Sequence, residues 1–255
     1  MSGIDEKGAM PLRGRVCVLL SGGMDSTVCL HWAMQKYRDV RAVGFDYGQP
    51  QRDSELVAAG KLARRYSIPF EMIVLADTLH SGFFKGIPEH DPQSTILHRA
   101  FVPARNVVFL SVALSRAARW WPDAVSDPGS RGKNTDITLV IGAVKDDADG
   151  FPDCRREFFY SCAKTLSLAI GRDVDVAAPY AGMTKEQMLA DAKGRFGSSI
   201  ADVQESWSCY AGKSACGICT PCVLRKRSFE AHAIDDLAVP AVMMGGDVGR
   251  ERGFA

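Results

Sequence analysis

The fold of this chain is decided by the stretch Val16-Cys17-Val18-Leu19-Leu20-Ser21-Gly22-Gly23-Met24-Asp25-Ser26-Thr27-Val28-Cys29-Leu30. Its first five residues form a short apolar run, which is typical of a buried parallel strand. A turn with two glycines follows, and Asp25-Ser26-Thr27 then provides the capping residues of a helix. A helix that begins directly after a glycine turn presents free backbone N–H groups and partial positive charge. The pattern therefore predicts an anion site, and phosphate is the usual occupant.

The composition of the chain excludes several classes of protein. The chain has 255 residues, 46% of them hydrophobic, and a net charge of +1. This balance favours neither nucleic acid nor a membrane surface as a partner. No apolar run reaches the length of about 18 residues that a transmembrane helix needs, and the polar N-terminus lacks the apolar core of a signal peptide. We expect a cytoplasmic protein, in which eight cysteines indicate metal binding or catalysis rather than disulfides.

Apolar and amphipathic runs alternate along the rest of the chain. Further strands are expected at 40–45, 68–75, 137–143 and 174–178, and helices at 55–66, 106–120, 155–171 and 184–195. Strands that alternate with helices predict an α/β fold with a Rossmann-like parallel sheet and helices on both faces. The helix at 106–120 is mostly apolar, so it is expected to be buried. Two stretches rich in Gly and Pro, 80–97 and 121–136, are expected to be loops.

Four cysteines lie close together in the C-terminal part: Cys209, Cys216, Cys219 and Cys222. Their spacing, C-x6-C-x2-C-x2-C, suits one tetrahedral Zn²⁺ ion. An iron–sulfur cluster is the competing occupant, and reduced thiols without a metal are the third possibility. Because four protein ligands leave no open position on zinc, the pattern predicts a structural role. The basic run at 225–227 is interpreted as a solvated helix face rather than an RNA contact.

Several blocks of sequence carry a resemblance to a known family. The stretch Ser21 to Ser26 resembles the SGGxDS loop of the ATP-pyrophosphatase, or PP-loop, superfamily, and it lacks the lysine of a Walker A motif. Together with four further blocks in the same chain order, it resembles the QueC family of 7-cyano-7-deazaguanine synthases. These blocks are Phe45-Asp46-Tyr47-Gly48-Gln49, Phe101-Val102-Pro103-Ala104-Arg105-Asn106, Gly150-Phe151-Pro152-Asp153-Cys154-Arg155-Arg156-Glu157-Phe158, and Ser206-Trp207-Ser208-Cys209-Tyr210 with the three further cysteines.

The resemblance implies a ligase that forms carbon–nitrogen bonds. It would convert 7-carboxy-7-deazaguanine and ammonia to the nitrile preQ0 in queuosine biosynthesis, through two successive adenylations. ATP with Mg²⁺ would be a substrate, the partners would be small molecules, and a homodimer is possible. We expect a flexible lead over 1–14, an ATP-binding domain of the adenine nucleotide α-hydrolase type over 15–200, a zinc-binding segment with the four cysteines over 201–238 and a tail over 239–255.

The resemblance also implies roles for residues of the nucleotide site. ATP would be bound by Leu20, Ser21, Gly22, Gly23, Met24, Asp25, Ser26, Thr27, Val28, Cys29 and Leu30. Catalytic or phosphate-binding roles are expected of Asp25, Arg105 and Lys185, because ammonium and guanidinium groups bind phosphate and carboxylate. Either Asp25 or Asp46 would help to hold Mg²⁺ through water.

The acceptor is expected to lie against the segment that follows the fourth strand. Asp147, Asp153 and Arg155 are the predicted substrate-binding residues, because an aminopyrimidinone edge offers N–H donors that a carboxylate accepts. Cys154, beside them, is left open between a reactive thiol and a buried one.

This chain departs from the family pattern at a few positions. Ala104 stands where the family usually has glycine, and Ala148 and Asp149 replace an aromatic residue and a serine. These changes motivate an alternative, a paralogue that stops at the amide or transfers the acid to another amine. A tRNA-binding or thiolating PP-loop protein and a non-catalytic zinc-binding module are alternatives from other classes.

Overall fold

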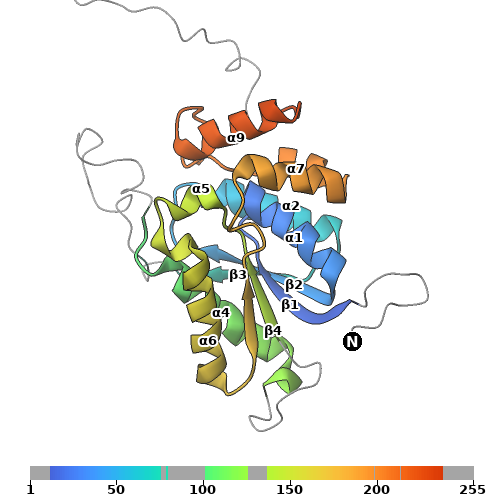
Figure 1. Ribbon diagram of the computed structural model, residues 1–255, viewed down its shortest axis with the longest axis vertical. Coiled ribbons are helices and arrows are strands. Elements are labelled where there is room, and N and C mark those ends of the chain that lie inside the picture. Colours follow the sequence, from blue (N-terminus) through green and yellow to red (C-terminus); the bar gives the residue numbers. More distant parts are fainter. Residues whose placement is uncertain are drawn as a thin grey trace, which may run out of the picture.

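Five parallel strands form the centre of the molecule. The computed structural model describes residues 12–75, 79, 101–125, 137–197, 199–212 and 214–237. The strands are β1 (Arg13–Leu19), β2 (Tyr37–Asp46), β3 (Phe70–Val74), β4 (Ile137–Ile141) and β5 (Val174–Ala177). They lie in the order β3-β2-β1-β4-β5, and every neighbouring pair is parallel (Figure 1). The predicted α/β fold with a parallel sheet is confirmed.

Helices cover both faces of this sheet (Figure 1). They are α1 (Met24–Lys36), α2 (Arg52–Arg65), α4 (Arg105–Trp120), α5 (Lys145–Ala148), α6 (Arg156–Ile170), α7 (Lys185–Phe196), α8 (Ser199–Gln204) and α9 (Thr220–Ala231). The core on one face is formed with α4 and α6, and the core on the other face with α1, α2, α7, α8 and α9. The C-terminal segment around the cysteines therefore adds α8 and α9 to the layer that contains α1, α2 and α7.

The alternation of side chains along β1 explains why both faces need a cover. Cys17 and Leu19 belong to the core formed with α4 and α6, whereas Val16 and Val18 belong to the opposite core. All four are at most 6% exposed. Because successive residues of a strand point to opposite faces, a strand that is buried on both faces has to be a continuous apolar run.

Most of the predicted elements are found within a few residues of their expected bounds. β1 begins at Arg13, which pairs with Tyr37, so the expected flexible lead loses its last two residues to the sheet. The helix expected to be buried, α4, is buried along one stripe only, and its polar residues such as Ser111 are exposed. The expected loop at 80–97, most of that at 121–136 and the tail at 239–255 lie outside the described residues.

The order of the strands places a ligand site at one edge of the sheet. From β1 the chain proceeds outward through β2 and β3, and β4 and β5 then lie on the other side of β1. The connections after β1 and β4 therefore diverge, and in open α/β sheets ligands bind at this divergence. The glycine loop follows β1, and the short helix α5 follows β4. No helix among the described residues is long and apolar enough to cross a membrane.

Candidate active site

The glycine loop after β1 leaves the start of α1 open to a ligand. Gly22 has a φ of +87°, and a Cβ there would overlap the carbonyl oxygen of Glu55, so this position requires glycine. Gly23 precedes α1 without a side-chain cap, so the first N–H groups of the helix have no partner within it. Gly142, after β4, lies so close that a Cβ would be 2.8 Å from the backbone nitrogen of Ser26. The loop and the helix start therefore have the geometry of an anion site.

Hydroxyl groups within the loop hold its shape. Ser26 Oγ and Thr27 Oγ1 both donate to the carbonyl oxygen of Gly23, at 3.0 and 2.9 Å. Thr27 is 1% exposed, and the three residues that follow it, 28–30, are fully buried in the core. Residues 27–30, at the end of the predicted ATP-binding stretch, thus support the loop from the core. The residues of the stretch that line the central cavity are Leu20, Ser21, Gly23, Met24, Asp25 and Ser26.

This central cavity has a volume of about 220 Å³. Its walls come from the loop, from the ends of β2 and β4, from the starts of α2, α4 and α7, and from the cysteine-bearing segment. A second cavity, of about 310 Å³, borders α2 and α8, where Arg65 pairs with Asp202 and Glu205. The central cavity is the better candidate for catalysis, because it contains the start of α1 together with the charged groups described next.

A lysine and two carboxylates meet beside the loop. Lys185 Nζ lies 2.7 Å from Asp25 Oδ2 and 3.8 Å from Asp147 Oδ1. Burial alone would lower the pKa of Lys185, but the two carboxylates outweigh it and raise this pKa, so the ammonium group stays charged. Asp25 Oδ1 is buried without a hydrogen-bond partner among the described residues. The arrangement can stabilise negative charge that develops beside α1.

Arg105 also lies in this cavity, at the first position of α4. Its interactions with Tyr47, and the nearby Cys154 and Asp153, oppose the effect of burial and raise the pKa of its guanidinium. Its position in the cavity favours a contact with a ligand over a surface salt bridge. The residue before it, Ala104, has a φ of +60°, which explains why a glycine is suited to this position.

The predicted acceptor-binding residues do not all meet in the cavity. Asp147 lines it, and burial raises the pKa of its carboxyl group despite the charge of Lys185. Asp153 is not among the lining residues, because its Oδ2 atom accepts a hydrogen bond from the backbone of Asn106, 3.2 Å away. Arg155 is exposed and is also absent from the lining. The structure thus brings one of the three to the site.

Cys154 does line the cavity, but its surroundings keep it protonated. The residue is 5% exposed, and burial, together with the charge of Asp147, raises the pKa of its thiol to about 12. A thiol with this pKa is a poor nucleophile at neutral pH. Of the two interpretations left open, the structure favours the buried thiol.

Several residues of the cavity wall were missed as site residues from the sequence. They are Tyr47, Gln49, Gln51, Glu55, Asn106, Phe109, Trp207, Ser208, Tyr210 and Pro221. Most lie in or beside the blocks that carry the family resemblance, which is the signal that could have identified them. Glu55 had a signal of its own: it precedes Ala59 and Leu62 by four and seven residues, so it shares their buried stripe on α2.

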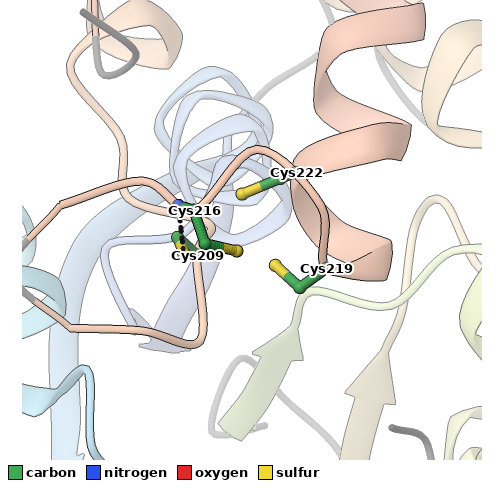
Figure 2. A group of neighbouring side chains, drawn as sticks. All are labelled: Cys209, Cys216, Cys219 and Cys222. Carbon is green, nitrogen blue, oxygen red and sulfur yellow. Dashed lines mark hydrogen bonds between the residues drawn. The ribbon is translucent and has the colours of Figure 1, made fainter. Parts of the chain in front are cut away.

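The four cysteines of the C-terminal part come together as one cluster. Their sulfur atoms all lie within 4.8 Å of one another, and Figure 2 shows the side chains of Cys216, Cys219 and Cys222 directed toward one another. Cys209 Sγ accepts hydrogen bonds from the backbone of Ala211 and of Cys216, both at 3.2 Å. Four thiols in this arrangement can hold a metal ion.

The cysteine cluster is coupled directly to the glycine loop. The backbone N–H of Trp207 donates to the carbonyl oxygen of Gly22 at 2.9 Å. Ser54 Oγ, on the first turn of α2, donates to the carbonyl oxygen of Gly212. Trp207 and Tyr210, on either side of Cys209, line the central cavity. The segment that a metal would stabilise is therefore also a wall of the site.

Arg225, on α9, is buried, and its guanidinium forms hydrogen bonds within the protein. It is 2% exposed, and its guanidinium donates to the carbonyl oxygens of Ser206 (3.0 Å), Val203 (3.2 Å) and Gln204 (2.9 Å). Its Nε atom lies 2.8 Å from Asp236 Oδ2. The interpretation of the basic run as a solvated face is wrong at this position, because the end of α8 needs donors for its free carbonyl groups.

Comparisons with known proteins cover most of the chain. The sequence profile of the family described as "Queuosine biosynthesis protein QueC" matches residues 15–233. A 7-cyano-7-deazaguanine synthase of Psychrobacter sp. (strain PRwf-1) is 34% identical over 243 residues, which is 86% of this chain and 87% of that protein. A protein of the same name from Caulobacter sp. (strain K31) is 32% identical over 235 residues, 84% of this chain and 88% of that one.

Solved structures resemble the chain more remotely. A 4-thiouridine synthetase in complex with RNA and ATP has 15% sequence identity and a TM-score of 0.44, and the match covers 87% of this chain and 55% of that one. A likeness at this level carries no conclusion about function.

Proposed function

Because the chain belongs to the QueC family, we propose that it is a carbon–nitrogen ligase that converts 7-carboxy-7-deazaguanine and ammonia to 7-cyano-7-deazaguanine with cleavage of ATP. The observation that carries the proposal is the pairing of Lys185 with Asp25 beside the glycine loop. Through this pairing, the positively charged ammonium group of Lys185 and the N-terminus of α1, whose first N–H groups are free, lie in one cavity. Such a site suits the pyrophosphate that leaves during adenylation.

The reaction then proceeds in two similar rounds. In the first, a carboxylate oxygen of the substrate attacks the α-phosphate of ATP, and pyrophosphate leaves toward Lys185 and the amides of α1. Ammonia attacks the acyl adenylate, and AMP leaves to give the amide. In the second round the amide oxygen is adenylated, and loss of AMP and a proton leaves the nitrile. Both rounds cleave the same bond of ATP, so the same residues would serve both, and Arg105, which lines the cavity, would hold the substrate carboxylate.

Metal ions fit two places in this scheme. Mg²⁺ would neutralise charge on the phosphates, and Asp25, with its buried and unpaired Oδ1, suits a contact through water. Asp46 suits it less, because its Oδ1 accepts from the backbone of Gly48 and the residue is not part of the cavity wall. The four cysteines fit Zn²⁺. The ion would cross-link the loop that carries Trp207 and Tyr210 and so stabilise this wall of the cavity.

The alternatives receive no specific support from the geometry. Ala148 and Asp149, which motivated a paralogue with another product, are not among the lining residues of the cavity. Arg225, which contributed to a possible RNA contact, is buried.

Release of AMP tests the proposal. Wild-type protein, with ATP, Mg²⁺, ammonium and 7-carboxy-7-deazaguanine, should release AMP and pyrophosphate only when the acid is present. The variants Asp25→Ala and Lys185→Met should lower this rate by about 100- to 1000-fold, the usual effect of removing a group that stabilises developing charge. Arg227→Lys, a change at an exposed residue of α9, is the matched control. Full activity of Lys185→Met would contradict the proposed role of the site.

A further inference from the structure

Three carboxylates line the central cavity, and two of them face the same cation. Asp25 and Asp147 both lie beside Lys185. Glu55 is the third, and it forms no ion pair within the described part of the chain. Its hydrogen-bond partners are the neutral side chains of Gln49 and Gln51. Glu55 is therefore the lining carboxylate that is not committed to the phosphate chemistry.

The turn after β2 holds this carboxylate in one position. Gln49 is 4% exposed; its Oε1 accepts from the backbone of Tyr47 at 3.0 Å, and its Nε2 donates to the carbonyl oxygen of Phe45 at 3.0 Å. The same Nε2 also donates to Glu55 Oε2 at 3.3 Å. The main chain of Glu55 in turn packs against Gly22. A carboxylate that accepts hydrogen bonds from Gln49 and Gln51 is suited to bind a ligand in a defined orientation.

The surroundings of Glu55 fit a flat, nitrogen-rich ring. Phe109 stacks on Phe45 with 4.2 Å between ring centroids, and it lies 5.4 Å from the ring of Tyr47, so aromatic surface borders the cavity. Arg105 lines the same cavity, and its charge favours the ionised form of both Asp147 and Glu55. A ligand with an acidic group near Arg105 and a ring directed toward Glu55 would contact both side chains.

We propose that Glu55 binds the N1–H and 2-amino groups of the deazaguanine ring and so determines which acceptor the enzyme accepts. The inference rests on the proposed function. The two oxygens of a carboxylate can accept two neighbouring N–H donors, and no other side chain on this wall offers that geometry among the described residues. Asp153, predicted for this role from the sequence, is turned toward Asn106, and Asp147 toward Lys185.

Steady-state kinetics with two acceptors test this assignment. Glu55→Gln keeps the shape of the side chain but replaces one accepting oxygen with a donor, and Glu230→Gln, at an exposed position of α9, is the matched control. At pH 8, above the raised pKa of Glu55, Glu55→Gln should raise KM for 7-carboxy-7-deazaguanine by about 10- to 100-fold, as expected for loss of a charged hydrogen bond. It should leave KM for ATP within about twofold. The wild type should also prefer this acid over its analogue without the 2-amino group by about tenfold or more, and Glu55→Gln should lose the preference.

Other results would overturn the assignment. A rise in KM for ATP instead would mean that Glu55 contacts the adenine ring, and a fall in kcat with both KM values unchanged would mean that it acts on the chemistry. If Glu55→Gln does not fold, Glu55→Asp takes its place. In either case, a wild type that uses 7-carboxy-7-deazaguanine and its analogue without the 2-amino group equally well is sufficient to reject the inference. A wild type that releases no AMP with either acid would instead reject the proposed function itself.

Discussion

Replacing Arg225 with lysine should destabilise the protein strongly even though the charge is kept. The guanidinium donates through Nη2 to the carbonyl oxygens of Val203 and Gln204, and a single ammonium group cannot reach these and its remaining partners together. A buried acceptor left without a partner costs about 1–3 kcal/mol. Since two carbonyl groups are at stake, we expect the free energy of unfolding to fall by about 3 kcal/mol.

Thermal and chemical unfolding measure this effect. For a chain of this size, a loss of about 3 kcal/mol corresponds to a fall in Tm of roughly 6–12 °C. The control is Arg227→Lys, two residues further along α9 at an exposed position, which should change stability by less than about 0.5 kcal/mol. Equal stabilities of the two variants would refute the conclusion that Arg225 holds the end of α8, and would restore the interpretation of a solvated face.

Four further outcomes are expected. Gly22→Ala should lose ATP turnover and at least about 2 kcal/mol of stability, because its Cβ overlaps Glu55; a normal melt with normal turnover would refute the loop geometry. Ala104→Gly should raise the free energy of unfolding by about 1 kcal/mol by relieving a left-handed alanine, and no gain in a denaturant titration would argue against that conformation. Cys219→Ser should lower the content of bound metal, Tm and AMP release together, since the cysteine segment lines the cavity; full activity in a metal-free variant would show that catalysis does not depend on the metal. Burial raises the pKa of Glu55 from 4.5 to about 7, so the folded chain keeps a proton that the unfolded chain releases, and stability is lost as pH rises through that interval. Glu55→Gln should thus exceed the wild type by about 2–3 kcal/mol at pH 8 and match it near pH 4, and a pH-independent difference would contradict this.

The fold could be predicted because its signals are local. The central strands contain continuous apolar runs, as in Val16 to Leu20, and several connections carry glycine or capping residues, such as Thr184 at the start of α7. The glycine loop is specific because Gly22 has no room for a side chain and lies at positive φ. The apolar runs and the capping residues depend on neighbours in the sequence, so one sequence is enough to reveal them, whereas the lack of room at Gly22 comes from Glu55 and Ala59.

The parts of the site that were missed depend on distant contacts. Arg225 looks like a surface residue in a basic run, and its carbonyl partners precede it by about twenty residues. Asp153 follows the correct strand, but the turn at 152–154 directs it to the start of α4. The spacing of Glu55 indicates that it lies on the buried stripe of α2, but its position in the cavity wall depends on the turn after β2, which supplies Gln49 as its partner. In each case tertiary packing decides, and local pattern does not.

The central claim is that one cavity activates a deazaguanine acid twice. The most direct test is mass spectrometry of the products after wild-type protein has reacted with ATP, Mg²⁺, ¹⁵N-ammonium and 7-carboxy-7-deazaguanine. We predict the nitrile with one ¹⁵N atom and two molecules of AMP for each nitrile formed. Amide as the final product with one AMP, or no reaction of the acid, would contradict the account.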